Sequence, residues 1–295
     1  MASIERTNLT SETTGGADHL GGVTTSYAVT TIDDPLADGT TVVFARNSSG
    51  VMVGYYQDAG GLTHGLIDVN GTLTTLDNPL GTAGTVLVGV NASGAILGEY
   101  GVATGGGEID QGFVDVGGTL TTINDPLGVL GTTYMGNINS RGQIDGFYTD
   151  TGGVQHGFFY DSGVYTTIDV PNSTGTNLLG INDSGTLIGI YWDAGGVQHG
   201  FVDKHGVFTT IDVPGALPGT TSVNAINNSG VLAGIYSDAA GTHGFVDSGG
   251  VFTTFDAPGA SNTTIWDIST TGVLVGSYQD AAGFHGFVAT PIHGA

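Results

Sequence analysis

One passage of about 44 residues recurs six times in this 295-residue chain, and this repetition limits the folds open to it more than any other feature. Its clearest landmark is a histidine motif, as in WDAGGVQHGFVD, which ends at Asp203. A second landmark, T-T-hydrophobic-Asp/Asn-x-Pro, follows in every copy except the last. A lone TTIDDP, from Thr30 to Pro35, stands near the N-terminus with no histidine motif before it. An orphan end at one terminus and its missing complement at the other indicate that the repeats close into a ring.

Each copy has the composition of short strands. Segments rich in Val, Ile, Thr, Tyr and Phe are cut by Gly, Asn, Asp and Pro every 8 to 12 residues or so. The three- and four-residue apolar spacing of a helix face is missing. In the fourth copy we expect strands at 176–181, 186–191, 199–203 and 207–212, and Pro214 ends the last one because it has no N–H to donate.

The sequence therefore predicts an all-β fold, a six-bladed β-propeller with four antiparallel strands per blade. Residues 28–35 would supply the outer strand of the blade whose three inner strands lie at the C-terminus. This N-terminal strand would close the ring without a disulfide, since the chain has no cysteine. We expect one propeller domain over residues 26–295 and a flexible polar tail over residues 1–25.

The charge of the chain argues against two classes of partner. Twenty-seven acidic residues against four basic ones give a formal net charge of −23. Nucleic acid and anionic membrane surfaces would repel such a protein, so we expect neither as a partner. No run of 18 apolar residues is present, and no transmembrane helix is expected. The expected state is a monomer.

The H-G-F triplet gives a resemblance to a known family. It occurs at His156, His199, His243 and His285, with N-x-S-G upstream and T-T-I-D-x-P downstream. In this combination it resembles the HAF-type repeats of bacterial extracellular proteins, over about nine-tenths of the chain. The resemblance implies a bacterial, exported propeller with an extracellular location, and it brings no catalytic residues with it. The N-terminus lacks the apolar core of a signal peptide, so export would use a removed signal or another route.

Five histidines and two rows of aspartates occupy repeated positions. The histidines are His64, His156, His199, His243 and His285, and Gln111 takes this place in the second copy. We expect each histidine to hydrogen-bond within its blade, because the Gln that replaces it once also offers a donor and an acceptor. The imidazoles are separated by whole blades, which is too far for them to share a metal ion. The aspartates cap turns at one face of the ring. That acidic face could hold Ca²⁺, although no specific calcium-binding loop is present and no metal ligand is assigned.

Departures from the repeat are better candidates for function than the repeat itself. The innermost strand of each blade lines the channel, and at its end Arg46 replaces a residue that is aliphatic in the other copies. Polar or aromatic groups beside the axis complete a predicted ligand-contacting cluster at the channel mouth: Arg46, Asp267, Trp266, Asn137, Asn224 and Tyr134. In the alternative interpretation, Arg46 and Asp267 form only an ion pair between neighbouring blades.

The second copy also departs from the repeat, through a longer hairpin, EYGVATGGGEIDQGF. It adds Glu99, Glu108 and Asp110 where other copies have a tight turn. These residues would flank the central pocket, or the hairpin is a tolerated insertion at a loop tip.

Two main functions and a third remain open. The first is a secreted acidic propeller that binds a carbohydrate or another small polar ligand, as a lectin does. It is favoured because neither G-x-S-x-G nor H-E-x-x-H nor any cysteine nucleophile is present. The second is an enzyme, a lyase, hydrolase or cyclase with its site at the channel mouth, which rests on analogy between folds. The third is a structural surface or matrix protein.

Overall fold

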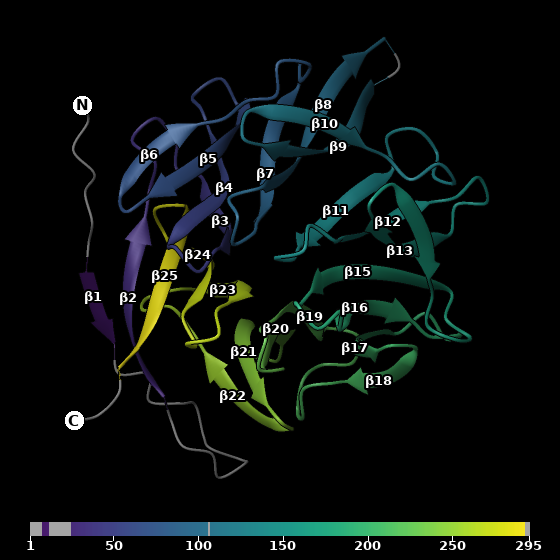
Figure 1. Ribbon diagram of the computed structural model, residues 1–295. Coiled ribbons are helices and arrows are strands. Elements are labelled where there is room, and N and C mark those ends of the chain that lie inside the picture. The colour runs from purple at the N-terminus through teal and green to yellow at the C-terminus, as the bar shows by residue number, and fades with distance from the viewer. Residues whose placement is uncertain (1–7, 12–24, 106, 293–295) are drawn as a thin grey trace.

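The computed structural model describes residues 8–11, 25–105 and 107–292, and every regular element in these ranges is a β-strand. The strands form six blades that follow one another around a central axis (Figure 1). The predicted six-bladed propeller is therefore confirmed. No helix long and apolar enough to cross a membrane occurs in the described residues.

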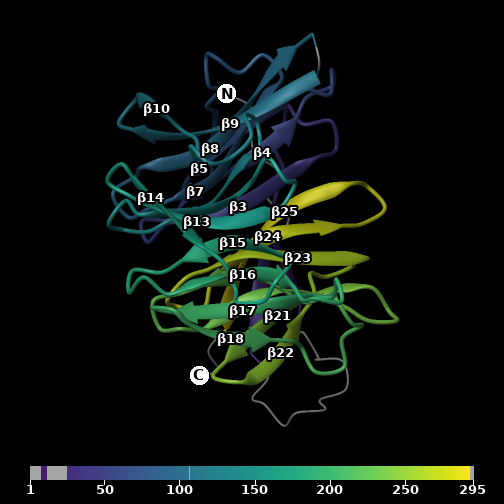
Figure 2. The ribbon, with the colours of Figure 1, turned by 90° about the vertical axis from the view of Figure 1, so that its right-hand side faces the viewer.

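Blades 1 to 4 are separate four-stranded antiparallel sheets. Blade 1 consists of β3 (Thr41–Arg46), β4 (Val51–Gln57), β5 (Thr63–Val69) and β6 (Thr72–Thr75). Blade 2 consists of β7 (Gly84–Val90), β8 (Ile96–Thr104), β9 (Gly107–Val116) and β10 (Thr119–Ile123). Blade 3 consists of β11 (Thr133–Ile138), β12 (Ile144–Thr149), β13 (Gln155–Asp161) and β14 (Val164–Ile168). Blade 4 consists of β15 (Gly175–Ile181), β16 (Leu187–Trp192), β17 (Gln198–Lys204) and β18 (Val207–Ile211), seen side by side in Figure 2.

Blades 5 and 6 complete the ring and are joined by a single parallel bridge between Thr242 and Asn262. Blade 5 consists of β19 (Ser222–Ile226), β20 (Leu232–Ser237), β21 (Thr242–Ser248) and β22 (Val251–Phe255). Blade 6 takes its three inner strands from the C-terminus and its fourth from the N-terminus: β23 (Asn262–Ile268), β24 (Leu274–Gln279), β25 (Phe284–Ile292) and β2 (Ser26–Ile32).

The pairing of β2 with β25 closes the ring as the sequence predicted. Ser26 lies opposite Ile292 at one end of this antiparallel ladder, and Ile32 lies opposite Gly286 at the other. A further strand, β1 (Asn8–Ser11), pairs with the outer edge of β2. The predicted polar tail over residues 1–25 thus contains a strand, because the free N–H and C=O groups of an edge strand accept another segment. The rest of that tail, residues 1–7 and 12–24, lies outside the described residues.

The blade-to-blade core depends on the glycine and the phenylalanine of the H-G-F triplet. The phenylalanine is fully buried in every copy that has it, at Phe158, Phe201, Phe245 and Phe287. Its ring lies over a glycine of the second strand, as Phe158 lies over Gly146, where a Cβ would come within 2.7 Å of the ring. The glycine of the triplet faces the next blade, and a Cβ on Gly157 would lie 2.9 Å from Leu178 of blade 4. Both glycines are therefore required for close packing.

The N-x-S-G turns link neighbouring blades through their asparagines. In blade 4, Oδ1 of Asn182 accepts the N–H groups of Ser184 and Thr186, each at 3.0 Å, and fixes the turn. Nδ2 of Asn182 donates to the carbonyl of Asn227 in blade 5 at 3.2 Å. The same donation joins Asn47 to Asn91, Asn91 to Asn139, Asn139 to Asn182 and Asn227 to Ser269. Blade 6 has Ser269 at this position, and no such bond from Ser269 to blade 1 occurs in the described residues.

Candidate functional site

The repeated histidines are held within their own blades, as predicted. Nδ1 of His64 lies 2.8 Å from Asp77, which follows the fourth strand, and Nε2 lies 3.4 Å from Asp58 of the hairpin. The imidazole stacks on Tyr56 with ring centroids 5.1 Å apart. Corresponding histidine–carboxylate pairs occur in four other blades, at His156, His199, His243 and His285. In blade 2, Gln111 accepts a hydrogen bond from Asn124. We call each Asp–His–Asp group a histidine clamp.

The clamps hold charge at the face where strands 2 and 3 of each blade are connected. The hydrogen bond to Asp77 raises the pKa of His64 above its usual value, although burial opposes this effect. The pKa of Asp58 is lowered, mainly because it accepts the N–H of Leu62. Among the described residues no group of three or more His, Asp or Glu side chains is arranged to hold a metal ion. The predicted Ca²⁺ therefore gains no ligand set from them.

The six channel candidates do not come together at one site. Arg46, Asn137 and Asp267 line a cavity of about 190 Å³ at the mouth beside the N-x-S-G turns. Trp266 and Asn224 lie deeper, around an apolar cavity of about 100 Å³ that Asn137 also borders. Tyr134 lines neither cavity and stacks on Phe147, with centroids 5.0 Å apart.

The carboxylate of Asp267, the amide of Asn224 and the indole of Trp266 are engaged within the protein. Asp267 accepts the backbone N–H groups of Arg46 at 2.9 Å and Ile268 at 2.7 Å. The contact that joins Arg46 to Asp267 is thus a backbone hydrogen bond, and Nη2 of Arg46 lies instead near Gly50 of its own turn. Burial raises the pKa of Asp267 to about 6. Nδ2 of Asn224 donates to a carbonyl of β23, and Nε1 of Trp266 donates to Ser277. These bonds occupy the polar atoms that Asp267, Asn224 and Trp266 would offer a ligand.

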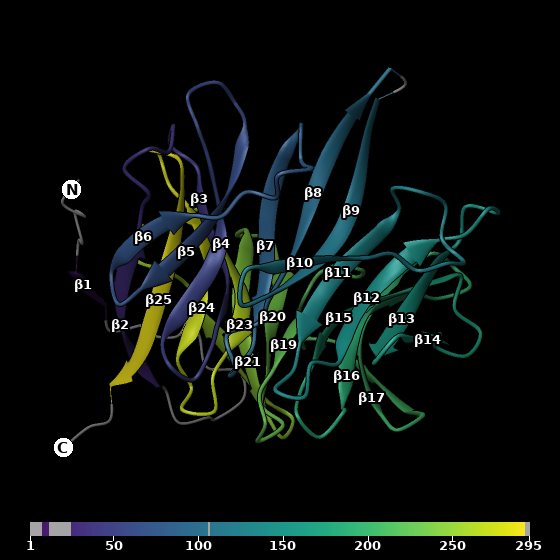
Figure 3. The ribbon, with the colours of Figure 1, turned by 45° about the horizontal axis from the view of Figure 1, so that its top comes forward.

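The longer hairpin of blade 2, β8–β9, projects beyond the neighbouring loops (Figure 3). Glu99 on β8 does not flank the channel mouth lined by Arg46, and its carboxylate accepts the N–H of Met135 in blade 3 at 2.6 Å. Burial raises the pKa of Glu99 to about 7, and the charge of Asp110 adds to this effect. Glu108 packs over Gly101 of the same hairpin. The three added acids therefore belong to the hairpin and to the contact between blades 2 and 3.

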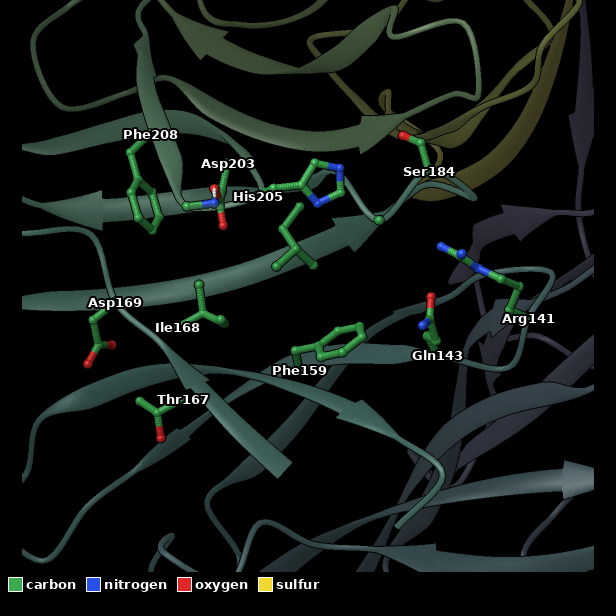
Figure 4. Close-up of a pocket in the computed structure, with 13 residues that line it drawn as sticks. Arg141, Gln143, Phe159, Thr167, Ile168, Asp169, Ser184, Asp203, His205 and Phe208 are labelled. Carbon is green, nitrogen blue, oxygen red and sulfur yellow. Dashed lines mark hydrogen bonds between the residues drawn. The ribbon is translucent and has the colours of Figure 1, made fainter. Parts of the chain in front are cut away.

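A cavity of about 550 Å³, larger than the two at the channel, lies between blades 3 and 4 and was not predicted from the sequence (Figure 4). We call it the 3–4 cleft. Blade 3 contributes Arg141 and Gln143 from its first turn and Phe159 from β13. Blade 4 contributes His205 from its last hairpin and Phe208 from β18. The remaining lining residues are Thr167, Ile168, Asp169, Ser184, Gly185, Leu187, Asp203 and Gly206.

Four of these lining residues depart from the repeat, and this signal could have identified the cleft. Arg141 stands where the other copies have Ser or Thr: Ser49, Ser93, Ser184, Ser229 and Thr271. Gln143 and Phe159 replace smaller residues, which are Val51 and Ile67 in the first copy. His205 stands where blades 2 and 5 have Gly117 and Gly249. The departures become informative only when the first turn and third strand of one blade are read together with the last hairpin of the next.

Blade 3 also carries a buried carboxyl on its second strand, beside its innermost strand, β11. Asp145 on β12 is fully buried, whereas the corresponding residues of the other blades are aliphatic: Val53, Leu97, Ile188, Ala233 and Val275. One of its oxygens accepts the N–H of Asn137 at 3.0 Å, and the other has no hydrogen-bond partner. Burial holds the pKa of Asp145 well above the usual value of a carboxyl.

A smaller cavity of about 290 Å³ occupies the corresponding position between blades 5 and 6. Val246 and Thr254 line it, where Phe159 and Thr167 line the 3–4 cleft, and Tyr27 of β2 completes it. Of the described residues that line this second cavity, none carries a charged side chain. The ring thus presents related clefts with different chemistry.

No family model and no curated protein matches the chain. Its backbone is similar to that of an Aleuria aurantia lectin solved in complex with Fucα1-6GlcNAc, at 13% identity and a TM-score of 0.51, over 88% of this chain and 97% of that chain. It is similar to the SapL1 lectin solved in complex with α-methyl fucoside, at 13% identity and a TM-score of 0.51, over 83% and 90%. It is also similar to TolB from Acinetobacter baumannii, at 10% identity and a TM-score of 0.55, over 78% and 60%. At these identities the likeness shows the fold alone, and the chain is a β-propeller.

Proposed function

We propose that this propeller is a carbohydrate-binding protein and that the 3–4 cleft is its principal binding site. The observation that carries the proposal is the concentration of four non-repeat side chains, Arg141, Gln143, Phe159 and His205, around this one cavity. A cavity of about 550 Å³ lies within the range of small-molecule sites in proteins.

The walls of the cleft have the two kinds of surface that a sugar requires. Phe159 and Phe208 are partly exposed and offer ring faces from opposite blades, against which the C–H face of a pyranose can pack. Arg141, His205 and Ser184 offer hydrogen-bonding groups for ring hydroxyls. Gln143 is already engaged, since it accepts from Asn139 and donates to Asp161, each at 2.8 Å. It holds the wall in place.

Two of the similar structures, the Aleuria aurantia lectin and SapL1, were solved with fucosides bound. Their backbones support a lectin-like function for the fold of this chain. The side chains of the 3–4 cleft set its own specificity, because four of them occur in only one of the six blade interfaces. We therefore expect one principal saccharide per chain, with the cavity between blades 5 and 6 as a weaker second site.

The test is a saccharide-array screen followed by calorimetric titration of the best ligand. The expected stoichiometry is about one, and Phe159→Ala should lower the affinity about tenfold through lost contact with the sugar face. The matched control is Val246→Ala, which changes the corresponding residue between blades 5 and 6 and should leave the principal site unchanged. A stoichiometry near six, or equal effects of the two substitutions, would contradict the proposal.

The enzyme alternative keeps less support. Its candidates Asp267, Asn224 and Trp266 donate or accept hydrogen bonds within the inner strands. Export of the protein and its membership of the HAF-type repeats stay predictions, and the matrix-protein alternative would be favoured if no saccharide binds.

A further inference from the structure

We infer that the 3–4 cleft selects acidic saccharides and that Arg141 and His205 bind their carboxylate group. This inference rests on the proposed function and adds the chemical class of the ligand. It starts from the scarcity of positive charge: the chain has four Lys and Arg residues against 27 Asp and Glu residues. One of the four lines this cleft, and a second, Lys204, directly precedes His205.

The two side chains approach the same point from opposite blades. Figure 4 shows the guanidinium of Arg141 and the imidazole of His205 pointing toward one another. Between them lies Gly185, where a Cβ would be 3.6 Å from Nη2 of Arg141 and 3.7 Å from Cε1 of His205. The φ of Gly185 is 81°, a conformation that favours glycine. The turn therefore leaves open the space between the two groups.

Neither the Arg141 nor the His205 side chain has an ion-pair partner in the part of the chain that the structure describes, whereas all five clamp histidines are paired with aspartates. Asp161 and Asp183 lie close enough for the charge of Arg141 to contribute to their lowered pKa values. Both are outside the lining, and their oxygens accept hydrogen bonds from other donors, which include Gln143 and the N–H of Ser140.

The carboxylates that do line the cleft are also engaged elsewhere. Asp203 is buried and accepts the N–H of Gly206 at 2.6 Å. Asp169 lies at the other end of the cleft and accepts from His156 at 2.8 Å. At the Arg141 end the free groups are thus a guanidinium and an imidazole, which together can bind one planar carboxylate.

The net charge of −23 does not prevent this contact. At physiological ionic strength the Debye length is about 8 Å, so distant carboxylates are screened and the groups in contact with the ligand dominate. A uronate unit is a pyranose with a carboxylate on its ring, and it can pack between Phe159 and Phe208 with that carboxylate at the Arg141 end. The class of ligand is therefore a uronate-containing oligosaccharide.

The experiment compares acidic saccharides with their methyl esters, which keep the sugar and remove the charge. Trigalacturonate, trimannuronate and the esters of both are titrated into the full chain by calorimetry. At least one acid should bind about tenfold more tightly than its ester. Arg141→Gln should remove that difference, because charge-assisted hydrogen bonds are roughly twice as strong as neutral ones. The control Lys204→Gln removes the same charge outside the lining and should change affinity less than about threefold.

The outcomes separate this inference from the proposed function. If neither acid binds more tightly than its ester while a neutral sugar such as α-methyl fucoside binds, the acidic class is wrong and the carbohydrate site stands. If Arg141→Gln and Lys204→Gln reduce acid binding alike, the effect is general charge, and the inference is overturned. If neither charged nor neutral saccharides bind, both proposals fail.

Discussion

The interface between blades 3 and 4 leaves an open cleft beside its apolar cluster of Leu178, Leu187 and Phe159, whereas an apolar cluster occupies the corresponding part of the interface between blades 1 and 2. Both are built from the same repeat. Ala45 and Val53 of blade 1 pack against Leu87 and Val90 of blade 2, with Val51 and Ile67 beside them. In blade 3 the residues corresponding to Val51, Val53 and Ile67 are Gln143, Asp145 and Phe159.

This comparison separates what the repeat supplies from what single substitutions add. The histidine clamp and the buried phenylalanine or leucine of the third strand occur in both regions and maintain the same backbone. A few side chains then decide whether two blades pack completely or leave room for a ligand. In our proposal, stability is shared around the ring and ligand specificity is confined to one interface.

The largest expected effect comes from placing a carboxyl in the filled interface. Val53→Asp should lower the free energy of unfolding by about 4 kcal/mol, because it buries an acid in an apolar cluster with no donor prepared for it. Urea denaturation, followed by tryptophan fluorescence, measures the change. The control Val53→Thr keeps the shape, and its single hydroxyl should cost about 1–2 kcal/mol. A loss below about 1 kcal/mol for Val53→Asp would show that the two interfaces tolerate charge equally.

The next effect comes from converting the open interface toward the filled one. The double variant Arg141→Ser, Gln143→Val copies Ser49 and Val51 of blade 1. Saccharide affinity should fall about 30-fold, equivalent to about 2 kcal/mol, while the free energy of unfolding changes by less than about 1 kcal/mol. Titration and denaturation of the same preparation measure both. The control Ser229→Ala changes the blade 5 residue that corresponds to Arg141 and should leave the affinity unchanged. If the double variant binds saccharide as the wild type does, the site does not lie in the 3–4 cleft.

A smaller effect distinguishes the buried acid of blade 3 by its dependence on pH. Burial raises the pKa of Asp145, so its contribution to stability is present below the unfolded pKa near 4 and is lost as the pH rises through the raised folded pKa. Asp145→Asn should therefore match the wild type near pH 3.5, below the unfolded pKa, and become more stable than the wild type as the pH rises to 8. Thermal denaturation across this range measures it. Parallel curves of stability against pH for the two proteins would refute the role of Asp145. Both curves should still slope, because Asp267 and Glu99 have pKa values of about 6 and 7.

The smallest effect concerns the clamps that both regions share. Because the pKa of His64 is raised, its contribution is present below an unfolded pKa near 6.5 and is lost as the pH rises through the folded value. His64→Gln, which copies the natural Gln111, should cost less than about 1 kcal/mol at pH 5.5 and almost nothing at pH 8, since solvent screens the partly exposed pair. His156→Gln should behave alike in denaturation experiments. A larger loss at His156 would mean that the open interface depends on its clamp.

The ring, its closure and the clamps could be predicted because each follows from residues that recur at fixed spacing. The orphan TTIDDP indicated the pairing of β2 with β25, and the exchange of His for Gln111 indicated a hydrogen-bonding role. The 3–4 cleft could not be predicted in the same way. It combines a turn and a strand of one blade with a hairpin of the next. The prediction considered only the innermost strands and selected residues such as Asn224, whose polar atoms hydrogen-bond to its own strand and to the innermost strand of the next blade.

Two other differences have local causes. A short strand such as β1 has no repeat of its own, and its partner, the outer edge of β2, becomes evident only once the ring is closed. The predicted ion pair of Arg46 and Asp267 placed the residues in the correct neighbouring blades. In the structure, the backbone N–H of Arg46 donates to the carboxylate of Asp267, and the side chain of Arg46 lies toward Gly50.

The closing ladder also determines how the ring responds to force. Ser26 and Ile292 are paired at the end of the ladder where the chain enters β2 and leaves β25. Tension applied across these two residues would pull on the outermost pair first and open the ladder one pair at a time, as a zipper opens, instead of shearing all seven pairs together. Blade 6 also has Ser269 in place of the asparagine that links each other blade to the next, and within the described residues the junction with blade 1 lacks that link. The propeller is therefore expected to resist tension least along the line that joins Ser26 and Ile292.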